Sequence, residues 1–309
     1  PLVDWDGGSL AGTARLDGTI QRQGTDAVAL HIDGNGEGLR CGSIDQPIWS
    51  EPKITIALDV VGQGPNSAPW SMFTSGMLQL QSGDDRCEAK LTSAVDWNGH
   101  AAPVPMTVEV TGDWTRWQQR LRPFWPDPTI TLAGKGTVLA TLAYSAATIE
   151  VQSALVKSQP LTITTADWLI QDPAFESTLQ GVWDVKSRTW TTPRTTAQGE
   201  WGEVTWTDGR FNASQPAGNV SGSVNLNVNM GRVSRWQHGD VKHHLLGQLS
   251  GSLDLKPDHD ALAGDINLRM TNVVVAGLST DPQPRWIALW REPELTVKGN
   301  VQHRLGGTP

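Results

Sequence analysis

The feature that most constrains this chain is an order of short motifs that recurs about every 120 residues. Leu10-Ala11-Gly12, Leu132-Ala133-Gly134 and Leu249-Ser250-Gly251 begin three similar stretches. Prolines at positions 52, 173 and 293 follow an acidic residue at spacings of 121 and 120 residues, and Arg-Trp-Gln occurs at 116–118 and 235–237. Such a period is typical of an array of one structural unit. It predicts units at residues 1–112, 113–231 and 232–309, the last one incomplete, within one continuous β-structure.

Strict alternation of apolar and polar residues predicts β-strands throughout the chain. Large apolar residues occupy the even positions of residues 53–60, and the same rule holds over residues 220–230 with one glycine gap. The pattern returns at residues 107–110, 148–152, 161–164, 265–270 and 295–298. Strands that are apolar on one side only are typical of antiparallel sheets with one solvated face.

Turn and helix signals lie between these strands. Clusters at residues 34–38, 82–85, 97–99 and 207–209 contain the glycine, asparagine and aspartate that tight hairpins require, so we expect hairpin turns there. A short helix is predicted over residues 113–121, with Asp113 as its N-cap and Pro123 beyond its end, and a counterpart over residues 232–238. One short helix per unit would then separate successive groups of strands.

The expected fold is therefore mainly β: an elongated, curved, mostly antiparallel sheet built from repeats of about 120 residues with one short helix per repeat. Many strands with one apolar face must cover that face with a second sheet, by curling, or with something other than protein. Helices are too few to cover it. A curved sheet that grows by adding units, with the apolar faces on its concave side, satisfies the pattern most simply.

Composition narrows the function. The 24 Lys and Arg residues against 32 Asp and Glu give a net charge of −8 without a basic run, which argues against nucleic acid as a partner. The sequence has neither an apolar run long enough to span a bilayer nor a signal-peptide pattern. A start without methionine and an incomplete third unit indicate an excised piece, whose missing flanks would carry any membrane anchor. Cys41 and Cys87, the only cysteines, fit either a disulfide or two small buried side chains.

The residue clusters that suggest chemistry are weak. His238, His243 and His244 form the one dense histidine group, but adjacent histidines on a strand point to opposite faces, so we expect a solvated loop and no metal site. The acidic pairs at 84–85 and 258–260 do not match a calcium loop, and the glycine-rich residues 34–38 lack the ending of a phosphate loop. No Gly-x-Ser-x-Gly motif is present, and we expect no enzyme activity and no cofactor. Fifteen tryptophans favour packing between elements, with sugar stacking, for instance at Trp201 and Trp206, as the alternative.

The Leu-x-Gly opening, the alternating strands, the strand introduced by Glu-Pro or Asp-Pro, and the segment from Gly112-Asp113 to Trp117 together resemble the long AsmA-like proteins of the Gram-negative envelope, relatives of TamB. The resemblance extends over nearly the whole chain and consists of the residue pattern and the order of the repeated motifs. The high tryptophan content departs from it. It implies a bridge-like lipid transfer protein of the periplasm, in which an apolar β-groove conducts phospholipid between inner and outer membranes.

Under this hypothesis the partners are phospholipid or another acyl-chain ligand, and membranes reached through missing flanking segments. The predicted lining consists of the apolar alternates, namely Ile54, Ile56, Leu58, Val108, Val110, Ile149, Val151, Val224, Leu226, Val228, Ile266 and Leu268. Two alternatives remain open. The chain is a tryptophan-rich β-domain of a surface protein that binds carbohydrate, or it is a structural spacer without a ligand.

Overall fold

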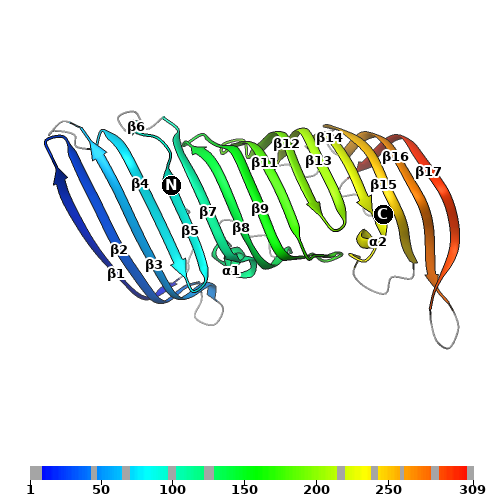
Figure 1. Cartoon of the computed structure of the whole chain (residues 1–309), viewed down its shortest axis with the longest axis horizontal. Helices are drawn as coiled ribbons and strands as arrows, with labels where there is room; N and C mark the ends of the chain where they lie inside the picture. The colour runs from blue at the N-terminus through cyan, green and yellow to red at the C-terminus, as the bar shows by residue number, and fades with distance from the viewer. Residues whose placement is uncertain are drawn as a thin grey trace. The chain divides into compact units, whose positions relative to one another are not determined.

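A computed structural model describes residues 9–42, 47–64, 70–96, 102–121, 129–213, 220–237, 243–257, 261–279 and 285–304. The chain forms two compact units, Pro1–Ala146 and Ala147–Pro309, each described here by itself. Both are mainly β, and every strand pairing within them is antiparallel, which confirms the predicted class of sheet (Figure 1). The boundaries predicted from the 120-residue period are not tested by this division and stay a prediction.

The first unit is a meander in which each long strand pairs with the next. Its elements are β1 (Ser9–Gln23), β2 (Ala27–Gly42), β3 (Pro47–Gln63), β4 (Met72–Ser82), β5 (Asp85–Leu91), β6 (Val95–Asp96), β7 (Val104–Asp113), α1 (Trp114–Leu121) and β8 (Thr131–Tyr144). The pairs run β1–β2–β3–β4–β5–β7–β8. The two-residue β6 continues the line of β5 beside β4. The predicted turn at residues 82–85 joins β4 to β5, with Gly83 at φ 57°.

The second unit is also an antiparallel meander. Its elements are β9 (Thr148–Thr164), β10 (Leu169–Asp172), β11 (Phe175–Asp184), β12 (Thr189–Gly199), β13 (Gly202–Asn212), β14 (Val220–Asn229), α2 (Met230–Val233), β15 (His243–Pro257), β16 (Ala261–Leu278) and β17 (Trp286–Arg304). β9 pairs with β11 along its first part and with β10 along its last part. From β11 to β17 each strand pairs with its successor.

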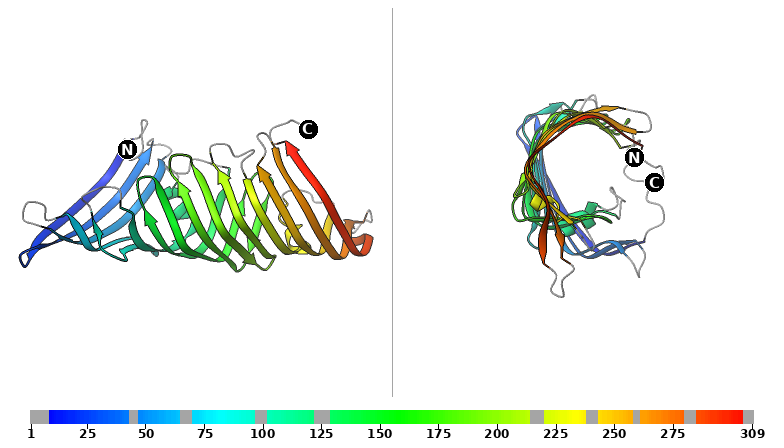
Figure 2. Two further views of the ribbon diagram at one scale, coloured as in Figure 1. Left: turned by 90° about the horizontal axis from the view of Figure 1, so that it is seen from above. Right: turned by 90° about the vertical axis from the view of Figure 1, so that its right-hand side faces the viewer.

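Each sheet is a single layer whose strands bend along their length, which the end-on view of Figure 2 shows clearly for β16 and β17. No second layer covers either sheet among the described residues, and helices contact only strands near them. Almost complete burial is accordingly rare. Among the described residues, only Val273, Asp85 and Ser158 have side chains that are nearly inaccessible to solvent.

The first helix prediction is confirmed. α1 begins after Asp113, whose carboxylate accepts hydrogen bonds from the backbone N–H groups of Thr115 (2.9 Å) and Arg116 (3.2 Å), as an N-cap should. The predicted counterpart begins two residues earlier than expected and ends at Val233, with Asn229 as its N-cap. The Arg-Trp-Gln motifs are therefore not equivalent, because Trp117 lies inside α1 and Trp236 lies three residues beyond α2.

Two predicted turns are wrong. Residues 34–38 lie inside β2. Residues 34–37 pair with both neighbouring strands, because Gly34 and Gly36 leave space that the side chains of Leu16 and Leu39 fill, and Gly38, at φ 59°, is without a partner in the register of either strand. Residues 207–209 lie inside β13, where Asp208 at φ 49° accompanies a register shift towards β14. The predicted strands at 148–152 and 161–164 are two parts of one strand, β9. The predicted turn at 97–99 lies outside the described residues.

Candidate functional site

The first unit has one apolar face, formed by rows of residues that lie directly opposite one another on neighbouring strands. Directly paired residues project on the same side of a sheet. One row crosses seven strands and consists of Leu16, Gly34, Ile56, Leu80, Cys87, Val110 and Val138. The next row on this face consists of Gly18, Ile32, Leu58, Leu78, Ala89, Val108 and Ala140.

The opposite face of the same sheet is polar. The row one residue beyond the first apolar row consists of Arg15, Asn35, Thr55, Gln81, Arg86, Thr111 and Thr137. On this face His31 contacts Asp59 through Nδ1 (2.6 Å) and Asp33 through Nε2 (2.8 Å). The side-chain hydrogen bond to Asp59 is the largest cause that raises the pKa of His31 above its ordinary value.

The second unit shows the same segregation over eight strands. Its apolar rows are Ala154, Leu179, Thr195, Trp206, Val224, Leu253, Ile266 and Gly299, and beside them Val156, Ser177, Ala197, Val204, Leu226, Gly251, Leu268 and Val297. A row on the opposite face is polar and consists of Lys157, Glu176, Gln198, Glu203, Asn227, Ser250, Arg269 and Thr296. β-bulges shift the register without mixing the two faces.

The structure brings the predicted lining residues together in two sets. The first unit places five of them on its apolar face, namely Ile54, Ile56, Leu58, Val108 and Val110. The second unit places seven on its own apolar face, namely Ile149, Val151, Val224, Leu226, Val228, Ile266 and Leu268. Val228 is buried and the other eleven are half-buried.

Tryptophans contribute to packing in the second unit. Trp183 and Trp190 pair directly with each other on the apolar face. Trp183 also pairs with Ile149, and Trp190 with Phe211. Trp206 lies on the same face and donates its Nε1–H to the carbonyl of Ser221 at 3.1 Å. Trp201 is only 9 % exposed and packs edge-on against Trp236, with ring centroids 5.8 Å apart. Trp201 is therefore not an exposed stacking surface, contrary to the sugar-binding expectation.

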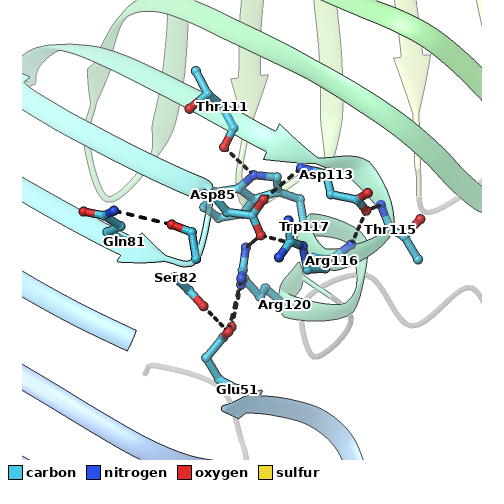
Figure 3. A network of polar contacts seen from close by, with 11 residues as sticks. Glu51, Gln81, Ser82, Asp85, Thr111, Asp113, Thr115, Arg116, Trp117 and Arg120 are labelled. Carbon is cyan, nitrogen blue, oxygen red and sulfur yellow. Dashed lines mark hydrogen bonds and ion pairs between the residues drawn. The ribbon is translucent and has the colours of Figure 1, made fainter. Parts of the chain in front are cut away.

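A buried ionic network lies at the α1 end of the first unit's apolar face, and Figure 3 shows Arg120 between the carboxylates of Glu51 and Asp85. Asp85 is 1 % exposed and the Arg120 side chain 12 %. Arg120 binds Glu51 through Nε (2.7 Å) and Asp85 through Nη1 (2.8 Å), while Arg116 binds Asp85 through Nε (2.9 Å). Ser82 donates its hydroxyl to Glu51.

The sequence of α1 explains how the network forms. Arg116 and Arg120 are four residues apart, so both project from one side of the helix. Trp117 donates its indole N–H to the carbonyl of Thr111 (3.0 Å), and the Arg120 guanidinium lies 4.7 Å from the Trp117 ring centroid. Burial alone would lower the pKa of Arg120, but hydrogen bonds to Glu51 and then Asp85 outweigh it, so this pKa is raised above its ordinary value.

The backbone also fixes the Asp85 carboxylate. Its Oδ1 accepts the backbone N–H of Asp113 at 2.9 Å, so the residue that caps α1 is itself held by the network. Gly112 precedes it at φ 139°, and a β-carbon there would lie 2.2 Å from Asp85 Oδ1. Only glycine fits this close approach.

The second unit has a related but distinct arrangement beside α2. Asp172, which precedes Pro173 as Glu51 precedes Pro52, is 2 % exposed and accepts the backbone N–H groups of Ala174 (2.8 Å) and Glu200 (3.0 Å). Arg232 pairs with Glu200 at the surface (2.7 Å). Trp201, which packs against Trp236, lies beside Asp172, because a β-carbon at Gly199 would be 2.2 Å from Asp172 Oδ2 and 2.7 Å from Trp201 Nε1.

The remaining sequence candidates do not assemble into a reactive centre among the described residues. No group of three His, Cys, Asp or Glu side chains there is placed to hold a metal ion. His243 and His244 lie in β15, not in a loop as expected, while His238 and residues 258–260 lie outside the described part. Cys87 is a free thiol whose pKa is raised by burial, and the side chain of Cys41 is not among those described. No described helix is long and apolar enough to cross a bilayer.

Sequence reasoning missed the ionic network. Glu51 entered only as part of a proline marker, and Arg120 entered only as a residue of a predicted helix. The available signal was a carboxylate before a strand proline together with two arginines four residues apart on a capped helix.

Comparison with known proteins adds no family: no family model, no curated protein and no solved structure matches the chain.

Proposed function

We propose that the apolar faces of the two sheets bind the acyl chains of phospholipids, and that the chain is a non-enzymatic segment of an AsmA-like protein that conducts lipid between the membranes of a bacterial envelope. In this role it works in the periplasm. The lipid headgroups stay in water while the chains lie against the rows of apolar side chains. No chemical step is involved.

The observation that carries this proposal is the set of apolar rows that run from strand to strand within each unit. Seven strands of the first unit and eight of the second place small or apolar side chains in line, with Thr195 and Ser177 as the polar members in the second unit, and no second sheet among the described residues covers these faces. Exposing so much apolar surface on one side of a sheet is typical of an interaction site. A face of this kind on a soluble spacer would be covered by a second sheet.

Crowding on the apolar faces fits a concave surface. At Gly34 a β-carbon would lie 2.6 Å from Leu16 Cδ2, and at Gly76 it would lie 3.0 Å from Leu91 Cδ1. Side chains converge on the inside of a bent sheet, so glycines there make room for their neighbours. A concave apolar face wraps an acyl chain more fully than a flat one.

Burial of an acyl chain on such a face is favourable in total, but it does not fix the chain at one position along the face. Each buried methylene contributes about 0.8 kcal/mol, and the contribution does not depend on the position of the chain along the surface. A lipid could therefore slide along a uniform row without crossing a large barrier. A transfer protein needs this property, whereas a storage protein does not.

The proposal includes the 120-residue repeat with one helix per unit. Supporting it, the N-caps Asp113 and Asn229 are 116 residues apart, and each precedes a helix whose arginine pairs with an acid of the preceding hairpin turn, Arg116 with Asp85 and Arg232 with Glu200. In each unit a buried carboxylate precedes a proline, Glu51 before Pro52 within β3 and Asp172 before Pro173 just after β10. In this view the helices fill the gaps where short hairpins end before their longer neighbours.

The first test is native mass spectrometry of the purified chain followed by lipid extraction. Co-purifying phospholipid at a defined stoichiometry supports the proposal. A protein that stays empty after incubation with phospholipid vesicles favours the spacer, and retention on a glycan array with no lipid bound favours the carbohydrate module.

Charge substitutions on the two faces make the test specific. Leu226→Asp puts a carboxylate on the apolar face, whereas Asn225→Asp puts the same charge one residue away on the polar face of the same strand. In the first unit, Val108→Asp and Thr107→Asp form the matching pair. We expect loss of lipid from the apolar-face variants only, with circular dichroism unchanged. Equal lipid loading in both members of each pair would refute the assignment.

A further inference from the structure

An open cavity of about 700 Å³ lies beside the ionic network, where β3 runs on past the turn between β4 and β5 and α1 fills part of the space. Trp49, Lys53 and Gln119 line it together with Glu51, Arg116 and Arg120. Pro52 and Ser82 also line the cavity, and each is two residues from a member of the apolar face, Ile54 and Leu80. Thr55 and Gln81 of the polar row line it as well. Two residues along a strand span about 7 Å, so the cavity lies at the end of the sheet and adjoins both the apolar and the polar face.

The cavity is cationic in an acidic protein. Three lining side chains are positive, Lys53, Arg116 and Arg120, against one negative, Glu51, and counting the adjacent Asp85 still leaves an excess of one positive charge. The whole chain carries −8. The cavity is thus an exception to the general charge of the molecule.

Two of these cations, Arg116 and Lys53, have N–H donors that are not used in bonds with described residues. Arg116 binds Asp85 through Nε only, its side chain is 44 % exposed, and its terminal NH2 groups form no bond with a described residue. A β-carbon at Gly83, which lines the cavity, would lie 3.5 Å from Arg116 Nη1, so these groups face the cavity. Lys53 is exposed and forms no ion pair within the described residues.

The second unit makes the corresponding place unsuitable for an anion. There Asp172 is satisfied by backbone N–H groups, and the indole of Trp201, which packs against Trp236, lies beside it. The second unit also has an open cavity here, of about 550 Å³, lined by Ala174 and Glu200 among others. Its charged lining residues are Lys157 against Glu176, Glu200 and Glu203, so it has an excess of negative charge, the opposite of the cavity beside α1.

We propose that this cavity binds a phosphate group, with Lys53 and the terminal NH2 groups of Arg116 as donors and Arg120 as a fixed positive charge beneath them. Arginine and lysine are the side chains that recognise phosphate, arginine through paired N–H donors and lysine as a point charge. Resting on the proposed function, the phosphate is that of a lipid whose acyl chains begin on the adjacent apolar face. A free phosphate ion has the same chemistry, and the test separates the two.

The test compares three ligands on the whole chain by isothermal titration calorimetry: inorganic phosphate, dihexanoyl phosphatidic acid, and dihexanoylglycerol, which has the same acyl chains without phosphate. The variants are Lys53→Ala and, as the control, Lys90→Ala, which removes another exposed lysine of the same sheet outside the cavity. Arginine Nε–Hε cross-peaks in NMR locate the site, with Arg269 of the second unit as the internal reference.

We expect Lys53→Ala to weaken phosphatidic acid binding about fivefold, which is the upper range for the loss of one exposed ion pair, and to leave dihexanoylglycerol binding unchanged. Lys90→Ala should change the binding of neither lipid. The Arg116 cross-peak should move with phosphatidic acid while that of Arg269 stays in place. If both lipids bind and Lys53→Ala alters neither, the cavity is not the phosphate site although the lipid face stands. If inorganic phosphate binds at Lys53 and neither lipid binds more tightly, the anion site stands and the lipid function fails. Absence of all binding overturns both.

Discussion

Removing the Asp85 carboxylate should open the α1 region of the first unit. Asp85→Ala deletes the acceptor for the Asp113 N–H and the partner of two guanidinium groups. Removing one partner of a buried ion pair costs about 3–5 kcal/mol, because the other charge stays buried. Arg120 keeps Glu51, and Arg116 is 44 % exposed, so the lower end applies. We therefore expect a loss of about 3 kcal/mol of local stability.

Hydrogen exchange followed by mass spectrometry measures this loss directly. A change of about 3 kcal/mol in the opening free energy corresponds to roughly 100-fold faster exchange in peptides covering residues 111–121, where exchange occurs through opening. Asp84→Ala is the matched control, because Asp84 is an exposed residue of the same turn and its loss should change stability by less than about 0.5 kcal/mol. If both variants exchange alike in this segment, the network does not hold α1 in place and the reasoning is wrong.

Three further predictions address single residues. The pKa of His31, measured by NMR titration, should lie above the ordinary value and should return towards it in Asp59→Asn. Because the folded-state pKa is raised, the contribution of His31 to folding stability is complete below the unfolded-state pKa of about 6.5 and disappears as pH rises through the folded-state pKa. The Cys87 thiol, whose pKa burial raises, should react with iodoacetamide at pH 8 more slowly in the folded chain than in urea, measured with the other cysteine changed to serine, and equal rates would contradict its burial. Gly112→Ala should lower the urea midpoint of the first unit, because its β-carbon would overlap the Asp85 carboxylate, and an unchanged midpoint would show that the end of β7 adapts at no cost.

Periodicity predicted the strands because a one-layer sheet with one apolar side leaves a strict alternation in the sequence. The apolar residues of 53–60 and 220–230 lie on one face each, as the pattern requires. The N-cap of α1 was predictable for a similar reason, since Asp113 satisfies N–H groups only two and three residues away. Local rules are sufficient where the partners are local.

Predictions from local composition were wrong where distant residues decide the conformation. Glycine-rich residues 34–38 have the composition of a turn, but their conformation depends on Leu16 and Leu39, whose side chains take the space over the glycines. Asp208 and Gly209 likewise form a bulge because the Trp206 ring lies over Gly209. The ionic network joins Glu51 to Arg120 across 69 residues, a pairing that alternation does not encode.

A single-layer sheet also determines how each unit comes apart. In a two-layer protein the loss of one strand exposes a shared core, and the whole domain melts. Here β17 pairs through its backbone with β16 alone among the described strands, so detaching it leaves the pairing of β15 with β14 intact. When force is applied to an edge strand, each sheet should lose one strand at a time. The force trace should then show a series of small steps, whereas a packed two-layer domain gives one large rupture.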